Sequence, residues 1–246
     1  MQDNTQPYVY NNVIEIEDAA ASRRFIANVF MWMFVALGLS AGLAWIFGHD
    51  ITLFKLLVDL ETGQRTGLGT VVMFLPLAFV LVMSFGMNKL NYPLLIVLFV
   101  AFALAMGLSL SFIFAAYAET TIAGVFITTS VVFGVMAVAG YITNQDLTKF
   151  GSILTMLLVG VVVASLVNWF MRSEGLSQII TYVGVAVFVG LTAYDVQKLK
   201  RIGSGMEYGQ ASTKKMAVMG ALTLYLDFIN LFLLLLRLFG GGRRSN

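Results

Sequence analysis

Long apolar segments alternate with short polar ones along almost the whole chain. Seven of the apolar segments are close to the roughly 20 residues that an α-helix needs to cross a bilayer. The pattern predicts an all-α integral membrane protein with a seven-helix domain over residues 25–239, a polar tail at 1–24 and a short tail at 240–246. The predicted spans are 25–47, 67–87, 92–114, 122–141, 151–171, 178–199 and 217–239.

Composition supports a membrane protein and excludes several kinds of site. Hydrophobic residues make up 59% of the chain and charged residues 11%, whereas soluble domains carry about 25% charged residues. The chain has no cysteine and one histidine, His49, which excludes disulfides, zinc-thiolate centres and His-rich metal sites. A net charge of +2 without a long basic run argues against nucleic acid as a partner. We expect no bound cofactor.

The basic residues predict an orientation in the membrane. With the N-terminus in the cytoplasm, nine basic residues fall on the cytoplasmic side and six on the other, which favours this orientation and a C-terminus outside. We expect the polar N-terminal tail and an amphipathic piece at 51–60 to lie along the membrane surface. The nine are Arg23, Arg24, Lys89, Lys149, Lys198, Lys200, Arg201, Lys214 and Lys215, and the six are Lys55, Arg65, Arg172, Arg237, Arg243 and Arg244.

The last predicted span, AVMGALTLYLDFINLFLLLLRLF, carries Asp227 near its midpoint. An acid at the centre of a membrane helix costs about 2.5–3.5 kcal/mol on insertion scales, so it needs a partner or a function. Gly220, Thr223, Asp227 and Asn230 are spaced 3, 4 and 3 residues apart, which places them on one helical face. We expect this face to border other helices or a water-filled path. A purely structural polar contact is the alternative.

A second acid, Asp195, lies near the inner end of the sixth span, in GLTAYDVQKLK. Thr192 shares a helical face with it, and the chain direction brings the inner ends of spans six and seven together. Two carboxyl groups within hydrogen-bonding distance share a proton, and their oxygens suit Ca²⁺. Both properties indicate passage of ions or protons, although Asp195 could instead be an interfacial residue paired with Lys198.

Two enzymatic functions are less well supported by the sequence than passage of ions. A YD pair followed by an acid on the next helix resembles intramembrane aspartyl proteases of the presenilin kind, but the GxGD and PAL elements of those enzymes are missing. The GxSxG string around Ser40 lies inside the first span without the strand-turn context of a hydrolase. We therefore expect no enzymatic activity, and helix packing as the role of Ser40.

The strings GALTLYLDFINLFLLLLRLFG and GLTAYDVQKLK, with seven spans, resemble the Bax inhibitor-1 family over essentially the whole transmembrane region. The short tails resemble bacterial members, which implies the inner (plasma) membrane. The resemblance implies a seventh helix surrounded by the other six, a di-aspartyl sensor and a pH-modulated Ca²⁺ leak. Asp195 and Asp227 occupy the two aspartate positions of that sensor.

One residue departs from the family pattern. Members often place an arginine at the inner end of the second helix, where it can bind the first aspartate. Here the corresponding stretch reads FGMNKLNY, so Lys89 is the candidate latch, and a lysine lacks the bidentate geometry of arginine.

The sequence thus predicts a pH-sensitive calcium leak channel. Its partners are the lipid bilayer, calcium ions and protons. Asp195 and Asp227 form the transient Ca²⁺ site and pH sensor, and Thr192, Thr223 and Asn230 are candidate pore-facing residues. Two alternatives are a proton-coupled cation exchanger and a non-transporting regulator that binds a membrane protease or another membrane protein.

Overall fold

The structure is a computed structural model that describes residues 7–205 and 210–240, with side chains from residue 20 onward. These described residues form nine helices, and their one isolated β-bridge joins Val58 and Arg65. The helices are α1 (Pro7–His49), α2 (Ile51–Phe54), α3 (Gly67–Gly86), α4 (Tyr92–Leu110), α5 (Ile113–Ala116), α6 (Glu119–Ile142), α7 (Thr148–Met171), α8 (Glu174–Ser204) and α9 (Ala211–Phe239).

The prediction of seven spans is confirmed. Within the described residues, seven segments are long and apolar enough to cross a membrane, and each contains or closely matches a predicted one. The predicted bounds are too short at several ends, because α8 and α9 extend as polar helix beyond their apolar stretches. At the N-terminus, α1 already begins at Pro7, so much of the predicted tail continues the first helix. Residues 1–6 and most of the C-terminal tail lie outside the described part.

The segment between α1 and α3 differs from the predicted amphipathic helix. Only Ile51–Phe54 is helical, and Asp50 caps this turn by accepting hydrogen bonds from the backbone N–H groups of Thr52 and Leu53. A tight turn then follows with Gly63 at φ 67°, a left-handed conformation that glycine adopts without strain. This turn, rather than an interfacial helix, connects the first two membrane spans.

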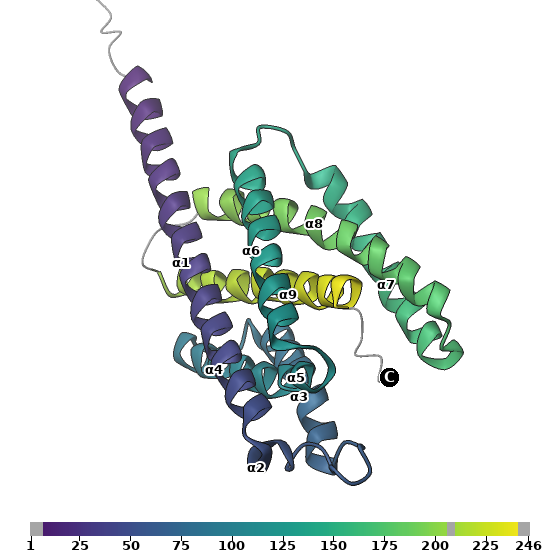
Figure 1. Ribbon diagram of the computed structural model, residues 1–246. Helices are drawn as coiled ribbons and strands as arrows, with labels where there is room; N and C mark the ends of the chain where they lie inside the picture. The colour runs from purple at the N-terminus through teal and green to yellow at the C-terminus, as the bar shows by residue number, and fades with distance from the viewer. Residues whose placement is uncertain (1–6, 206–209, 241–246) are drawn as a thin grey trace, which may run out of the picture.

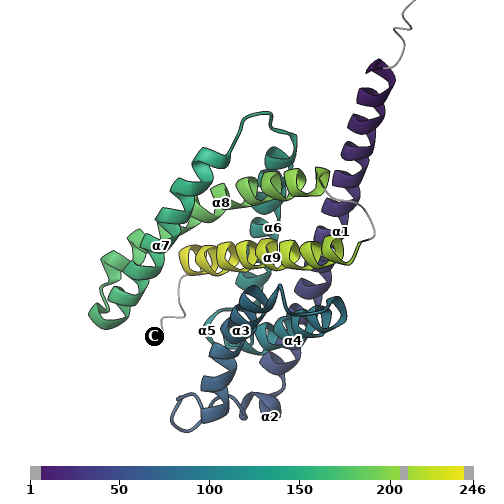
Figure 2. The ribbon, with the colours of Figure 1, turned by 180° about the vertical axis from the view of Figure 1, so that it is seen from behind.

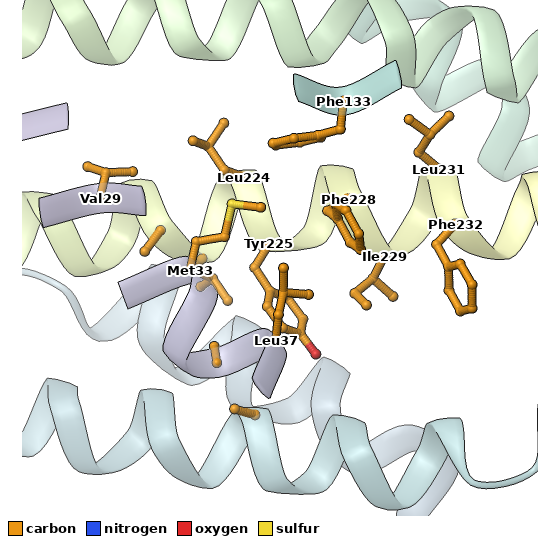
Figure 3. Packing of buried hydrophobic residues seen from close by; sticks show 14 of the residues in the cluster. Val29, Met33, Leu37, Phe133, Leu224, Tyr225, Phe228, Ile229, Leu231 and Phe232 are labelled. Carbon is orange, nitrogen blue, oxygen red and sulfur yellow. The ribbon is translucent and has the colours of Figure 1, made fainter. Parts of the chain in front are cut away.

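Helix α9 packs against four other helices, namely α8, α1, α6 and α4. In Figure 1 it crosses the middle of the molecule, and Figure 2 shows α8 and α4 on opposite sides of it. Of the seven spans it is the most enclosed, with 67% of its most apolar window buried. Figure 3 shows its Leu224, Tyr225 and Phe228 meeting Met33 of α1 and Phe133 of α6. Because lipid is as apolar as these side chains, close van der Waals packing holds the helices together.

One buried polar contact joins three helices in this core. The Ser40 hydroxyl oxygen of α1 lies 2.7 Å from the Ala103 carbonyl oxygen of α4 and 2.7 Å from the Tyr225 hydroxyl oxygen of α9. All three groups are buried and mutually satisfied. The serine of the GxSxG string therefore serves helix packing, as the sequence predicts.

Glycines permit close approach at two helix crossings of α8. A Cβ at Gly140 of α6 would lie 2.2 Å from the Ala193 carbonyl oxygen, and one at Gly151 of α7 would lie 2.2 Å from the Tyr194 ring. Neither position has room for a side chain, so both crossings depend on glycine. By contrast, Gly38 and Gly42 of α1 have open space around them, so these two glycines make no close helix contact.

Helix α7 is the least enclosed span. Only 6% of its most apolar window is buried, and it packs chiefly against α8. In Figure 1 the hairpin of α7 and α8 extends away from α1. As a result, α7 stands apart from α9 and leaves space between them.

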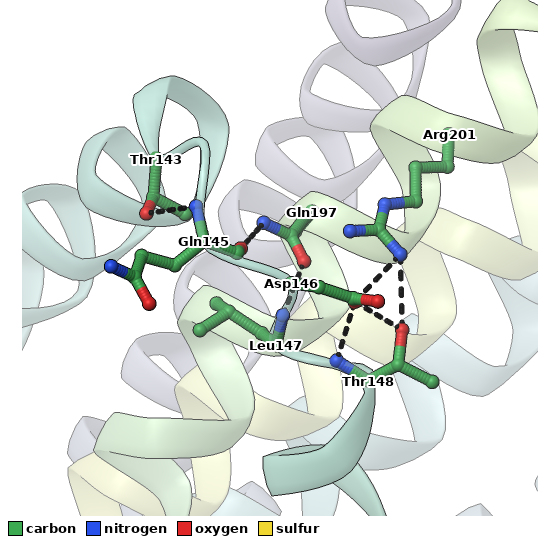
Figure 4. A network of polar contacts seen from close by, with 7 residues as sticks. All are labelled: Thr143, Gln145, Asp146, Leu147, Thr148, Gln197 and Arg201. Carbon is green, nitrogen blue, oxygen red and sulfur yellow. Dashed lines mark hydrogen bonds and ion pairs between the residues drawn. The ribbon is translucent and has the colours of Figure 1, made fainter.

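A polar network fixes the linker between α6 and α7 to α8 (Figure 4). The Gln197 amide accepts a hydrogen bond from the Leu147 N–H at 2.9 Å and donates one to the Gln145 carbonyl at 2.7 Å. Asp146 forms an ion pair with Arg201 at 2.8 Å. The linker determines where α7 begins, so this network helps to hold α7 at its distance from α9.

The network predicts a pH-dependent stability difference. Hydrogen bonds from the Thr148 hydroxyl and N–H, followed by the Arg201 contact, lower the pKa of Asp146 from 3.8 to about 2. A lowered folded-state pKa stabilises the fold above the unfolded-state value and loses this effect as the pH falls toward the folded-state value. Asp146→Asn should therefore lower the melting temperature slightly at neutral pH. It should have no such effect near pH 2, because Asp146 becomes protonated there in the folded protein as well. Thermal unfolding of both proteins in detergent across pH checks this, and a difference that persists at low pH would contradict it.

The orientation of the chain is a separate prediction. Reporter fusions after residue 205 should report a cytoplasmic location, and fusions after residue 240 an external one, because nine basic residues lie on the predicted inner side. The two positions bracket α9, so the same location at both would show that α9 does not cross the membrane.

Candidate functional site

A cavity of about 1050 Å³ lies between α7, α8 and α9, where α7 stands apart from the bundle. Its α9 wall runs from Thr223 to Arg237, which is about 21 Å at 1.5 Å per residue. The hydrocarbon core of a bilayer is about 30 Å thick, so the cavity covers roughly two-thirds of it. Most of the lining is apolar, and the polar groups follow one face of α9 and the inner end of α8.

Asp227 lies in the wall of this cavity and is only 5% exposed. Within the described residues, its Oδ2 atom is buried without a hydrogen-bond partner. Burial of a carboxyl oxygen without a hydrogen-bond partner costs free energy. Such a group in a native protein therefore needs an explanation, such as a bound ion or a functional role. The atom is therefore a candidate ligand for a proton or a cation.

Asp195 of α8 lines the same cavity across from α9. The two carboxyl groups therefore face the same space, and a hydrogen bond between them would require a proton on one of them. The positive charge that acts on Asp195 belongs to Lys198, three residues further along α8. Both acids thus line one cavity, and their pairing stays a prediction.

The three candidate pore-facing residues divide into two groups. Thr223 and Asn230 line the cavity together with Asp227, as their spacing predicts. Thr192 does not line the cavity. It is fully buried, and its hydroxyl donates to the Phe188 carbonyl at 2.8 Å. The reason is a rotation of α8 that turns Leu191 and Asp195 to the cavity and Thr192 into the helix contact.

Sequence reasoning missed several residues of the site. Arg237 lines the end of the cavity opposite Lys198, and its guanidinium donates a hydrogen bond to the Ser177 hydroxyl. Thr155, Ser165 and Trp169 contribute the α7 wall. Their spacing on one face of α7 was the available signal, but this spacing alone does not distinguish a cavity wall from a lipid-facing surface.

Lys89 lies in the turn after α3, where its side chain is exposed. The ion pairs among the described residues join His49 to Glu119 and Arg201 to Asp146, so the candidate latch between Lys89 and Asp195 is not formed in this structure. The reason is the position of α3, which packs chiefly against α4 rather than α8. The latch from Lys89 stays a prediction for another state.

The arrangement fits a weakly held divalent cation better than a resident metal. Two carboxyl groups offer at most four oxygens, whereas Ca²⁺ takes six to eight oxygen ligands. The side-chain oxygens of Thr223 and Asn230 lie along the same wall, and water would supply the rest.

Comparisons with known proteins agree with this architecture. The family described as "Inhibitor of apoptosis-promoting Bax1" matches residues 22–244. The chain is 43% identical over 229 residues to the inner membrane protein YbhL of Escherichia coli strain K12, covering 93% of this chain and 96% of that protein. It is 40% identical over 224 residues to an uncharacterized protein of Rickettsia prowazekii, covering 90% and 91%. The chain therefore belongs to the Bax inhibitor-1 family, as a bacterial-type member located in the inner membrane.

Proposed function

We propose that the protein is a pH-sensitive calcium leak channel whose ions pass along the cavity between α7, α8 and α9. The observation that carries this proposal is the Asp227 carboxyl group, buried at the cavity wall with one oxygen unpartnered. A hard anionic oxygen in a polar stripe inside a membrane is suited to Ca²⁺. In this proposal α9 is the central helix of the bundle and presents that stripe to the path.

The proton dependence arises from the pair of carboxyl groups. Two carboxyl groups within hydrogen-bonding range do not both ionise cheaply, so Asp195 and Asp227 share one proton. Ionised Asp195 attracts the Lys198 ammonium group on the next turn of α8 and keeps this positive charge at the inner end of the cavity, where it repels entering Ca²⁺. Acidification neutralises Asp195, so the Lys198 side chain is released and the repulsion is relieved. The other ionisable side chains that line the cavity are those of Tyr117, Tyr194 and Arg237.

Ca²⁺ flux into liposomes that contain the purified protein tests this function. A leak should carry Ca²⁺ down its gradient and respond to pH, but a proton gradient should not drive Ca²⁺ uphill. Uphill movement would show that the protein is a proton-coupled exchanger and not a leak channel. A complete lack of flux would favour a regulator that binds another membrane protein.

A further inference from the structure

A second cavity, of about 390 Å³, lies between α1 and α6 at the end of the membrane where α1 finishes. These two helices pack against α8 and α9 but have no more than marginal contact with each other in the described chain. Ile229 and Phe232 of α9 form the floor between them. The exposed side chains of Trp45 and Ile127 stand at its two rims. The cavity is therefore a groove that opens sideways toward the lipid.

The groove is nearly as long as the hydrocarbon layer of one membrane leaflet is thick. Its α1 wall runs from Leu37 to Trp45 and its α6 wall from Glu119 to Ile127. Each wall spans eight residue steps, or about 12 Å of helix. One leaflet contributes about 15 Å of hydrocarbon. A chain that enters at the membrane surface would thus reach nearly to the midplane at Leu37 and would pass Ser40, whose hydroxyl is already bonded to Ala103 and Tyr225.

The mouth of the groove carries one ion pair. The His49 Nε2 atom lies 2.9 Å from the Glu119 Oε1 atom, and the His49 Nδ1 atom lies 2.8 Å from the Trp45 carbonyl oxygen. Both ring nitrogens face acceptors, so the imidazole has no donor left for a ligand. Glu119 is two-thirds exposed, and within the described residues its second carboxylate oxygen accepts no hydrogen bond. The mouth thus offers a hydrogen-bond acceptor, flanked by the aromatic rings of Trp45 and Phe114.

We propose that this groove binds one phospholipid of the surrounding leaflet, with an acyl chain between α1 and α6 and an ammonium headgroup at Glu119. An acyl chain suits this groove because the walls are apolar, the opening faces the lipid, and the groove is nearly as long as one leaflet is thick. The carboxylate and the neighbouring aromatic rings match an ammonium group, which donates hydrogen bonds and binds to aromatic faces. A headgroup with only hydroxyl groups and a phosphate would place its negative charge beside Glu119. This binding is independent of the proposed ion path, which lies on the other side of α9.

Native mass spectrometry of the full chain tests the proposal. The protein is reconstituted in an equal mixture of phosphatidylethanolamine and phosphatidylglycerol with the same acyl chains, then released into mild detergent. One phosphatidylethanolamine should stay bound, in about tenfold excess over phosphatidylglycerol, as expected for a charge-assisted hydrogen bond. Glu119→Gln should abolish this preference while a lipid is still retained. A wild-type protein that retains no lipid, or both lipids equally, contradicts the proposal.

Two variants test the place of binding. Ala41→Trp and Ala123→Trp fill the groove from opposite walls, and each should remove the bound lipid. Val35→Trp is the matched control, because Val35 is exposed on α1 outside the groove, and it should retain the lipid. Circular dichroism shows which variants are folded. The test of the binding place needs only one folded variant of the two groove positions. Undiminished lipid in a folded groove variant would place the binding elsewhere and overturn the assignment.

Discussion

Asp195→Asn is expected to leave the Ca²⁺ leak open and nearly independent of pH between about pH 5 and pH 8. Asp195 is the acid on which Lys198 acts, and it shares the cavity with Asp227. An asparagine cannot ionise, so in this proposal nothing keeps the Lys198 charge at the inner end at any pH. The titrating pair is also reduced to one carboxyl group. Ca²⁺ flux into liposomes at a series of pH values measures both effects.

The matched control is Glu61→Gln, which removes an acid from the exposed loop between α2 and α3. It should keep the flux and the pH response of the unaltered protein. Lys198→Gln should reproduce the open state of Asp195→Asn, because it removes the other partner of the attraction. A pH response in Asp195→Asn equal to that of the control would show that another group senses the pH.

Asp227→Asn is expected to reduce Ca²⁺ flux by about tenfold or more, which corresponds to the loss of roughly 1.4 kcal/mol of ion stabilisation. Asp227 supplies the buried, unpartnered oxygen in the cavity wall. The amide keeps an oxygen ligand but loses the charge that offsets dehydration of the ion. The change preserves the size of the side chain, so the helix packing around α9 should be retained.

The two substitutions are expected to change Ca²⁺ flux in opposite directions. If the two acids had only a structural role, both variants would lose Ca²⁺ flux or both would keep it. Gel filtration and thermal unfolding distinguish a folded, poorly conducting Asp227→Asn protein from a misfolded one. Flux at the level of the Glu61→Gln control in both variants would leave the two acids as structural groups only.

The sequence predicted the spans and the polar face of α9 because both depend on local periodicity. Apolar length defines each crossing, and the spacing of Thr223, Asp227 and Asn230 fixes their common face whatever surrounds it. The resemblance to the family placed Asp195 and Asp227 in the same site, and the cavity contains both.

The position of α7 could not be predicted in this way. Its residues are as apolar as those of α9, and in a membrane the same side chain serves equally against lipid or protein. Only contacts between distant residues, such as Gly151 with Tyr194 and Asp146 with Arg201, determine that α7 stands apart. The same limitation explains the error at Thr192, whose surroundings depend on the rotation of α8.

The natural absence of cysteine allows a direct test of the path. Asn230→Cys places a single thiol in the cavity wall, and Glu61→Cys places one in the exposed loop between α2 and α3, outside the cavity. Ca²⁺ flux is measured in liposomes before and after reaction with a bulky, water-soluble thiol reagent, with labelling confirmed by mass. If ions pass along this cavity, modification of Asn230→Cys blocks the flux and modification of Glu61→Cys does not. Full flux through the modified Asn230→Cys protein would contradict the proposed path.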